Sequence, residues 1–396
     1  MSMRAISAVF PVLTNRGKAK GIDDFMKKGR CKMKWLNSDR KRIVLMGCIT
    51  TLLLSSNLAK ADFILGPPTN LGPIVNISDT DVQPTISSDG LSLYFQSKRP
   101  GGHGKHDLWV TTRATTLEPW GEARNLEPPL NSPYVDGSPY ISCDGLELYF
   151  GSDRPSEAGG AGIYVSTRAT SEDAWGEPVE LGPALAGIGR ISITADGLEL
   201  YGSAWNRPGG NGGHDIWVSR RISKEEPWGE PVVLPSPPNT SGREMHPEIS
   251  PDGLALFFES VGQSGNRNIF VSTRVTKEDP WGPAVNLGPT LESTFVVETM
   301  PSLWTEGLEL YFSRNHQSGT FAFDLCKASI IPIVDLNADG IVDAEDMCII
   351  VDNWGTDNKL CDIGPMPWGD GIVNVEDLIV LANHLFEEFP PVDSGQ

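Results

Sequence analysis

The chain has 396 residues, and its 51 Asp and Glu outnumber its 32 Lys and Arg, which gives a formal net charge of −19. The length allows two or three domains with ample core, and 42 Gly with 31 Pro indicate a turn-rich, all-β protein. The negative charge argues against nucleic acid or an anionic membrane as partner, because both select a basic surface. A cation or a neutral ligand fits this charge better.

Residues 1–61 have the opposite charge, with 13 Lys and Arg against 3 Asp and Glu. An apolar run of 12 residues from Ile43 to Leu54 precedes the small-residue pattern Ala59-Lys60-Ala61. This order is typical of a secretory signal peptide, and the run is too short to span a bilayer as a helix. We expect cleavage after Ala61, a secreted or cell-surface location, and no membrane span in the mature chain. A retained anchor is the alternative, and Met33 is an alternative start.

Residues 62–330 contain five copies of one pattern, in which an acidic residue and Gly precede Leu and then Leu-Tyr-Phe or a close variant. The turn glycines are Gly90, Gly145, Gly197, Gly253 and Gly307. Gly accepts the positive φ of a hairpin turn, and alternating Leu and aromatic residues are typical of a strand packed on one face. A second apolar strand follows each turn. Four copies then reach a Trp-Gly pair, at Trp120, Trp175, Trp228 and Trp281.

Five copies of about 54 residues, each with four strands, predict a five-bladed β-propeller. Six blades are less favoured because the sequence lacks a sixth copy. The fifth copy ends near Ser329 without a Trp-Gly pair or a closing strand. The segment that closes the fourth copy, Asn286-Leu287-Gly288-Pro289, recurs as Asn70-Leu71-Gly72-Pro73 before the first copy. We therefore expect an N-terminal strand to complete the fifth blade and close the ring.

Two of the copies, Asp89 to Arg113 and Asp196 to Arg220, also share an Arg-Pro-Gly-Gly segment that starts at Arg99 and Arg207. Together with the Asp-Gly turns, these segments resemble the TolB-type, WD-like β-propeller repeats of bacterial envelope proteins. The resemblance covers the region from residue 62 to about residue 330. It implies a fold more than an activity, because propellers serve as binding platforms, scaffolds and enzymes.

One recurring position bears on function. Eight residues before each turn acid lies another acid in four of the copies, and Ile188 takes its place in the third. These acids are Asp81, Asp136, Glu244 and Glu298. We favour the interpretation that each caps its own blade by accepting hydrogen bonds from backbone N–H groups. The alternative is a polar or cation-binding pocket, because the first strand of a blade lines the central channel. Four similar acids do not form the asymmetric pair that glycoside hydrolysis uses.

A different pattern begins after Pro332. Residues 335–346 fit the calcium loop of an EF-hand, with oxygen ligands at the required positions and Gly340 at the sharp turn. The predicted ligands are Asp335, Asn337, Asp339, Ile341 through its carbonyl, Asp343 and Asp346. Position 12 departs from the EF-hand pattern, since Asp346 replaces the usual Glu.

A weaker copy of the loop ends at Asp377, and its first two ligand positions fall on Met366 and Trp368, which cannot bind calcium through their side chains. Asp362 would substitute if this loop carries an insertion. The predicted ligands of the second site are Asp362, Asp370, Ile372, Asn374 and Asp377. An amphipathic helix is expected after each loop. Cys348 and Cys361 are close in sequence and could pair in an exported protein.

Two Asp-ended calcium loops, each followed by one helix, resemble type I dockerin modules. The resemblance covers residues 333–388 and implies Ca²⁺ as cofactor and a cohesin-type domain as partner. The resemblance implies that the residues just before the last calcium ligand of each loop bind the partner. Here these residues are Ala344, Glu345, Val375 and Glu376. These residues differ from the Ser-Thr pair that is common in cellulosome dockerins. The expected organisation is a signal region 1–61, a propeller 62–330, a dockerin-type module 331–390 and a tail 391–396.

The sequence favours a secreted, non-catalytic binding or scaffold protein. Its propeller would present a surface for a carbohydrate or protein ligand, and its calcium-dependent module would dock to a cohesin-bearing assembly linked to polysaccharide degradation. The alternative is a propeller glycoside hydrolase or polysaccharide lyase that the same module tethers. The enzyme is less favoured because the repeat contains no unique acid and base pair, no nucleophile motif and no phosphate loop.

Overall fold

The computed structural model describes residues 63–78, 80–155, 160–261, 267–274, 276–287, 297–315, 322–332, 334–336, 341–356, 361, 363–364 and 372–385. The chain divides into two compact units, of which the first is Ile64–Ile331 and the second contains the residues from Pro332 onward. The predicted signal region, residues 1–61, lies outside the described residues. No helix in the described ranges has the length and apolar character needed to cross a membrane.

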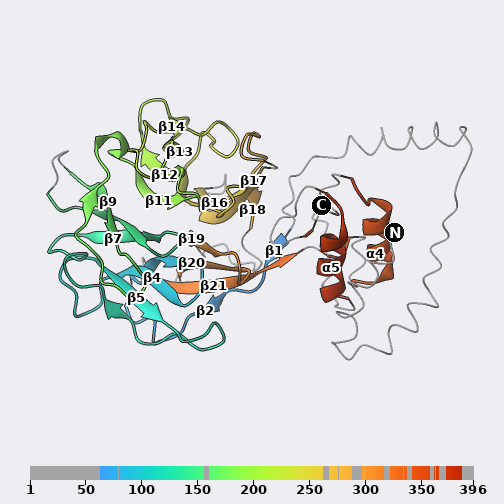
Figure 1. The fold of residues 1–396 in the computed structure, drawn as a ribbon, viewed down its shortest axis with the longest axis horizontal. Coiled ribbons are helices and arrows are strands. Elements are labelled where there is room, and N and C mark those ends of the chain that lie inside the picture. The colour runs from blue at the N-terminus through green and yellow to red at the C-terminus, as the bar shows by residue number, and fades with distance from the viewer. Residues whose placement is uncertain are drawn as a thin grey trace, which may run out of the picture. The chain divides into compact units, whose positions relative to one another are not determined.

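The first unit is all-β and consists of five antiparallel sheets that follow one another in chain order (Figure 1). The first blade contains β3 (Val82–Ile86), β4 (Ser92–Ser97), β5 (Asp107–Thr112) and β6 (Arg124–Asn125). The second contains β7 (Asp136–Ile141), β8 (Glu147–Ser152), β9 (Gly162–Thr167) and β10 (Val179–Glu180), and the third contains β11 (Gly189–Ile193), β12 (Glu199–Trp205), β13 (His214–Arg220) and β14 (Val232–Val233). The fourth contains β15 (Glu244–Ile249), β16 (Ala255–Val261), β17 (Arg267–Thr273) and β18 (Val285–Asn286). The fifth contains β19 (Glu298–Trp304), β20 (Glu309–Asn315) and β21 (Phe323–Pro332).

The first strand of each blade contacts the first strand of the next, and β19 contacts β3, so the inner strands form a closed ring. The predicted five-bladed propeller is therefore confirmed. Two N-terminal strands, β1 (Phe63–Leu65) and β2 (Thr69–Asn70), join β21 in the fifth blade (Figure 1). In this pairing Asn70 lies opposite Cys326, and its side-chain amide donates to Asp324 at 2.8 Å. The N-terminal closure expected from the Asn-Leu-Gly-Pro repeat is present.

The repeated turn, arginine and tryptophan form one structural unit in the first four blades. In the first blade Gly90 has a φ of +70°, and its carbonyl accepts a hydrogen bond from Nε of Arg113 at 2.7 Å. The same guanidinium lies 4.3 Å from the ring centroid of Trp120. The equivalent arginines in the next three blades are Arg168, Arg221 and Arg274. Most recurring residues are thus structural, as the sequence predicts.

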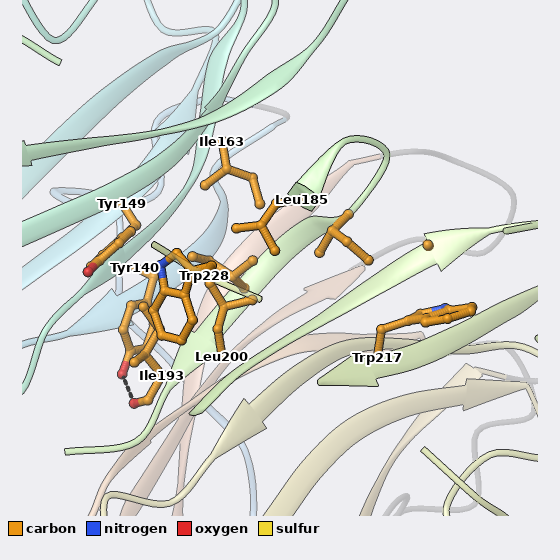
Figure 2. Packing of buried hydrophobic residues seen from close by; sticks show 11 residues of the cluster. Tyr140, Tyr149, Ile163, Leu185, Ile193, Leu200, Trp217 and Trp228 are labelled. Atoms are coloured by element: carbon orange, nitrogen blue, oxygen red, sulfur yellow. Dashed lines mark hydrogen bonds between the residues drawn. The ribbon is translucent and has the colours of Figure 1, made fainter. Parts of the chain in front are cut away.

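The hydrophobic core lies between adjacent blades. Figure 2 shows the cluster between the second and third blades, where Tyr140 and Tyr149 pack near Leu200. Tyr140 also donates its hydroxyl to the carbonyl of Ile193 at 2.5 Å. Because each cluster draws residues from two sheets, the blades stabilise one another, and the ring positions the inner strands around a common centre.

The second unit contains two helices, α4 (Ala344–Asp352) and α5 (Val375–Asn383), at the places where the sequence predicts them. Each begins with a capping box, in which Asp343 or Asn374 accepts a hydrogen bond from a backbone N–H of the first turn. The core of this unit contains Val342, Ile350, Val373, Cys361, Ile363, Leu378, Leu381 and Leu385. No disulfide joins the four described cysteines, which are Cys143, Cys326, Cys348 and Cys361, so the pairing considered for Cys348 and Cys361 is not formed.

Candidate functional site

Each inner strand carries a β-bulge at the same place. The bulge residue has a φ of 53° to 59°, a left-handed conformation that is uncommon for residues other than Gly. These five residues, which we call the cavity ring, are Gln83, Ser138, Arg190, His246 and Met300. A backbone requirement explains why the bulge recurs. It does not explain why the five side chains differ.

The cavity ring lines a central cavity of about 40 Å³. The other lining residues are Pro84, Thr85, Pro139, Tyr140, Ile191, Pro247, Glu248 and Pro301. The volume is ample for one water molecule, which needs roughly 10–15 Å³, and it admits a small polar group such as a carboxyl.

A second set of inner-strand side chains connects neighbouring blades. Thr85, Ser192, Glu248 and Ser302 each accept a hydrogen bond from a backbone N–H of the next inner strand, at 2.9 to 3.3 Å. Glu248 is the carboxyl group of this set, and its Oε1 accepts from the N–H of Leu303 at 3.0 Å. Burial raises the pKa of Glu248 to about 7, although the hydrogen bond from Leu303 acts in the opposite direction.

His246 forms a buried pair with Glu259, with 2.8 Å between Nδ1 and Oε2. Thr299 donates a hydrogen bond to the same carboxylate. Burial alone would raise the pKa of Glu259, but His246 and the nearby arginines lower it, so the carboxylate is ionised. Burial and then Arg190 lower the pKa of His246 to about 4, so the imidazole is neutral at pH 7. Its Nδ1–H therefore donates to Glu259.

This tautomer leaves Nε2 of His246 as a hydrogen-bond acceptor. The side chain is 6% exposed and lines the central cavity. Nε2 has no hydrogen-bond partner among the residues that the structure describes. A buried polar atom without a partner is rare and usually indicates a ligand, a water molecule or a catalytic role.

Basic side chains surround this pair. Arg190 is exposed toward the central cavity and forms no hydrogen bond or ion pair with any described residue. Arg267 lies 3.4 Å from Oε1 of Glu259. Burial, followed by Arg190 and Arg243, lowers the pKa of His214, which stands on the third strand of the third blade. Arg190 and Arg267 both attract the carboxylate of Glu259, and Arg243 acts on His214. Three arginines therefore gather near this pair in a chain with a net charge of −19.

The four acids considered for the channel bind within their own blades and do not line the central cavity. Asp81 is fully buried, accepts from the backbone N–H groups of Ile77 and Ser78 at 2.8 Å, and pairs with Arg99 at 2.8 Å. Asp136 pairs with Arg154 in the same way. This arrangement agrees with the blade-capping interpretation, and the carboxylates of Asp81 and Asp136 are held within their own blades.

The other two acids also bind locally. Glu244 accepts from the backbone N–H of Thr240 at 3.0 Å, and Glu298 lies 3.3 Å from Nε of Arg314. In the third blade, where Ile188 replaces the acid, Arg207 donates to the carbonyl of Ala186 at 2.7 Å instead. The equivalent arginines Arg99, Arg154 and Arg207 therefore each donate a hydrogen bond to an oxygen atom of their own blade.

The predicted calcium ligands are only partly within the described residues. Asn337, Asp339, Asp362 and Asp370 lie outside them, and Asp335, Ile341, Asp343, Asp346, Ile372, Asn374 and Asp377 lie within them. Asp346 is fully buried and accepts from the N–H groups of Leu336 and Asp343 at 2.7 and 2.8 Å. No group of three or more His, Cys, Asp or Glu in the described ranges could hold a metal ion.

Asp377 repeats the arrangement of Asp346, because it is fully buried and accepts from the N–H groups of Gly364 and Asn374 at 2.8 and 2.5 Å. The predicted partner-binding residues form the first turns of the helices, Ala344 and Glu345 in α4 and Val375 and Glu376 in α5. Both glutamates are exposed.

The amino-acid sequence alone does not identify Arg190, His246 and Glu259 as site residues. The repeat does mark the cavity-ring positions, because each lies two residues after the recurring acid position and precedes Pro in four blades. Positions that vary inside a strict repeat are candidates for function, because packing does not determine them.

Comparisons with known proteins give similarities of fold. No protein-family model and no curated protein matches the chain. A solved structure of a putative TolB from Agrobacterium tumefaciens is 18% identical to this chain, with a TM-score of 0.39. The match covers 60% of this chain and 70% of the TolB chain. The catalytic domain of a GH62 α-L-arabinofuranosidase from Coprinopsis cinerea is 12% identical, with a TM-score of 0.48, and covers 68% and 98%. At these identities the similarity concerns the propeller architecture alone.

Proposed function

We propose that the protein is a secreted, non-catalytic binding protein. Its propeller holds a ligand at the central cavity, and its C-terminal unit docks to a cohesin-type domain in an assembly linked to polysaccharide degradation. The observation that carries the non-catalytic part is the state of the carboxyl groups. Among the described lining residues Glu248 is the one carboxyl group, and its Oε1 already accepts the N–H of Leu303.

Glycoside hydrolysis requires two carboxyl groups on opposite sides of the scissile bond, one to protonate the leaving oxygen and one to attack or to activate water. Asp81, Asp136, Glu244 and Glu298 are held by their own blades. Glu259 is held by His246, Thr299 and Arg267. This distribution supports ligand binding over hydrolysis.

One observation favours the enzymatic alternative, a polysaccharide lyase or glycoside hydrolase. His246 lines the central cavity, its Nδ1 is oriented by Glu259, and its buried Nε2 has no hydrogen-bond partner among the described residues. A histidine oriented in this way can accept a proton from a bound molecule. Its pKa of about 4 makes it a weak base at neutral pH, so binding remains the preferred function.

The calcium part of the proposal rests on the chemistry of the donors. Asp335, Asp343, Asp346 and the carbonyl of Ile341 are hard oxygen ligands of the kind that Ca²⁺ selects. A bound Ca²⁺ would neutralise the carboxylates of the loop and couple metal binding to folding of the unit. The exposed Glu345 and Glu376 lie beside the apolar Ala344 and Val375 and would form the docking surface.

The test is to incubate the mature chain with a panel of neutral and acidic polysaccharides and to measure binding and product formation in the same samples. We expect binding without new reducing ends and without the ultraviolet absorbance of an unsaturated product. Turnover by the wild-type chain that is lost in His246→Gln or Glu248→Gln, and retained in a control variant of the exposed Glu122, would establish the enzyme instead.

A further inference from the structure

We propose that the central cavity binds the carboxylate of an acidic sugar residue through Arg190, and that Trp205 supports the sugar rings outside the cavity. The inference rests on the proposed binding function and names the ligand of the same site. Four features carry it: an arginine that forms no hydrogen bond or ion pair with described residues, a group of arginines around it, an acceptor atom without a donor and an exposed tryptophan.

Arg190 differs from the recurring arginines of the propeller. Arg113, for example, bonds the turn carbonyl of Gly90 and stacks on Trp120. Arg190 has no such contact with described residues and is exposed toward the central cavity. The fold does not require a cation there, because the same bulge position holds Gln, Ser, His and Met in the other blades. A guanidinium presented in this way fits a carboxylate, which it can bind through two parallel hydrogen bonds.

The charge around the site selects an anion. After burial, Arg190 lowers the pKa of both His246 and His214, whereas Glu259 raises both. Arg267 and Arg243 act in the same direction as Arg190, and the opposing groups are Glu259 and Glu248, whose pKa is about 7. Because the chain as a whole carries −19, the site attracts anions only at short range. The net charge of the chain favours a cation or a neutral ligand, but the arginines near the cavity determine which ligand binds there, and they favour an anion.

The acceptor atom Nε2 of His246 favours an acidic sugar over an acidic peptide as the ligand. Nε2 of His246 needs a donor, and a hydroxyl group next to a sugar carboxylate can provide one. The side chain of Asp or Glu has a carboxylate but no hydroxyl, so it would leave Nε2 without a partner. The volume of about 40 Å³ admits a carboxyl group. In the proposed complex the ring that carries this group lies toward the surface of the propeller.

Trp205 provides that surface on the third blade, at the end of β12. Its side chain is 53% exposed, which is high for a tryptophan, and His214 lies 4.8 Å from it between ring centroids. The guanidinium of Arg243 lies 5.3 Å from the indole centroid. His214 links this surface to the site electrostatically, since Arg190 and Glu259 both affect its pKa. Gly213 leaves room for the indole, because a Cβ there would lie 3.1 Å from the ring.

The experiment is calorimetric titration of the full mature chain with a short galacturonic acid oligomer, a neutral galactose oligomer of equal length and a glutamate-rich peptide. We expect the acidic oligomer to bind, with an affinity that falls as salt rises, and the other two to bind at least about tenfold more weakly. Arg190→Gln should weaken the acidic oligomer about tenfold or more. The matched control Arg124→Gln, at an exposed arginine of β6, should leave it unchanged.

Trp205→Ala should also weaken binding, and because the side chain is exposed we expect an unchanged melting temperature. Equal affinity for the neutral oligomer, or no effect of Arg190→Gln in a folded protein, would overturn the inference and leave a binding function in place. Preference for the peptide would overturn it as well. Cleavage of the acidic oligomer would overturn the non-catalytic proposal and keep the assignment of the sugar.

Discussion

The central cavity buries the carboxyl group of Glu248, and the substitution Glu248→Gln measures the cost of that burial. Glu248 is 8% exposed, and burial raises its pKa from the ordinary value of 4.5 to about 7. This difference corresponds to on the order of 3 kcal/mol of folding free energy. Gln has the same shape, and its Oε1 can still accept the N–H of Leu303, which lies 3.0 Å from Oε1 of Glu248. The substitution therefore removes the charge and keeps the link between blades.

The raised pKa of Glu248 determines how the stability of the folded state changes with pH. Between pH 4.5 and 7 the folded state holds the Glu248 proton more tightly than the unfolded state, so stability falls as pH rises through this window. Below pH 4.5 both states are protonated and the penalty is absent, and above pH 7 it is fully developed. The variant should match the wild type near pH 4 and exceed it at pH 8 by on the order of 3 kcal/mol.

The assay is urea unfolding of the propeller at pH 4, 6 and 8 for the wild type, Glu248→Gln and a control, Glu122→Gln, at an exposed site. The difference between wild type and Glu248→Gln should grow with pH, and the control should show none. A difference that is the same at all three pH values, or a variant less stable than the wild type at pH 8, would refute the reasoning. In that case the carboxylate would be well solvated or would hold a cation.

Three further predictions concern other parts of the molecule. Asp81→Ala should destabilise the propeller by about 3–5 kcal/mol in urea unfolding, because it leaves the buried Arg99 without its carboxylate; a loss below about 1 kcal/mol would contradict this. A chelator should lower the calorimetric transition of the unit after Pro332 and leave that of the propeller unchanged, whereas one transition indifferent to chelator would oppose the calcium proposal. Gly213→Val should weaken binding of the acidic oligomer, since its Cβ would displace Trp205, and unchanged affinity would argue against the stacking role.

The fold could be predicted because each blade must satisfy the same backbone requirements. The turn at Gly90 requires positive φ, and the guanidinium of Arg113 then has a fixed carbonyl to bind, so the same residues recur in the following blades. Closure was visible for the same reason, since Asn70 repeats the residue that ends the fourth blade. In the second unit the capping residues Asp343 and Asn374 mark where the two helices begin.

The candidate site could not be predicted in this way because it breaks the repeat. Arg190 and His246 occupy equivalent bulges, yet each interacts with groups on other strands, such as Glu259 on β16 and Thr299 on β19. A linear sequence does not show that these groups converge. The recurring acids were visible but are structural, because four similar carboxylate sites each serve their own blade. Net charge misled for a related reason, since −19 is a property of the whole surface and the cavity collects arginines.

The most direct test of the central claim is a crystal structure of the mature chain grown with a galacturonic acid oligomer. We predict that one carboxylate lies against the guanidinium of Arg190 with a hydroxyl at Nε2 of His246, and that every glycosidic bond is intact. An oligomer bound elsewhere with the central cavity unoccupied, or a cleaved product in the cavity, would contradict it.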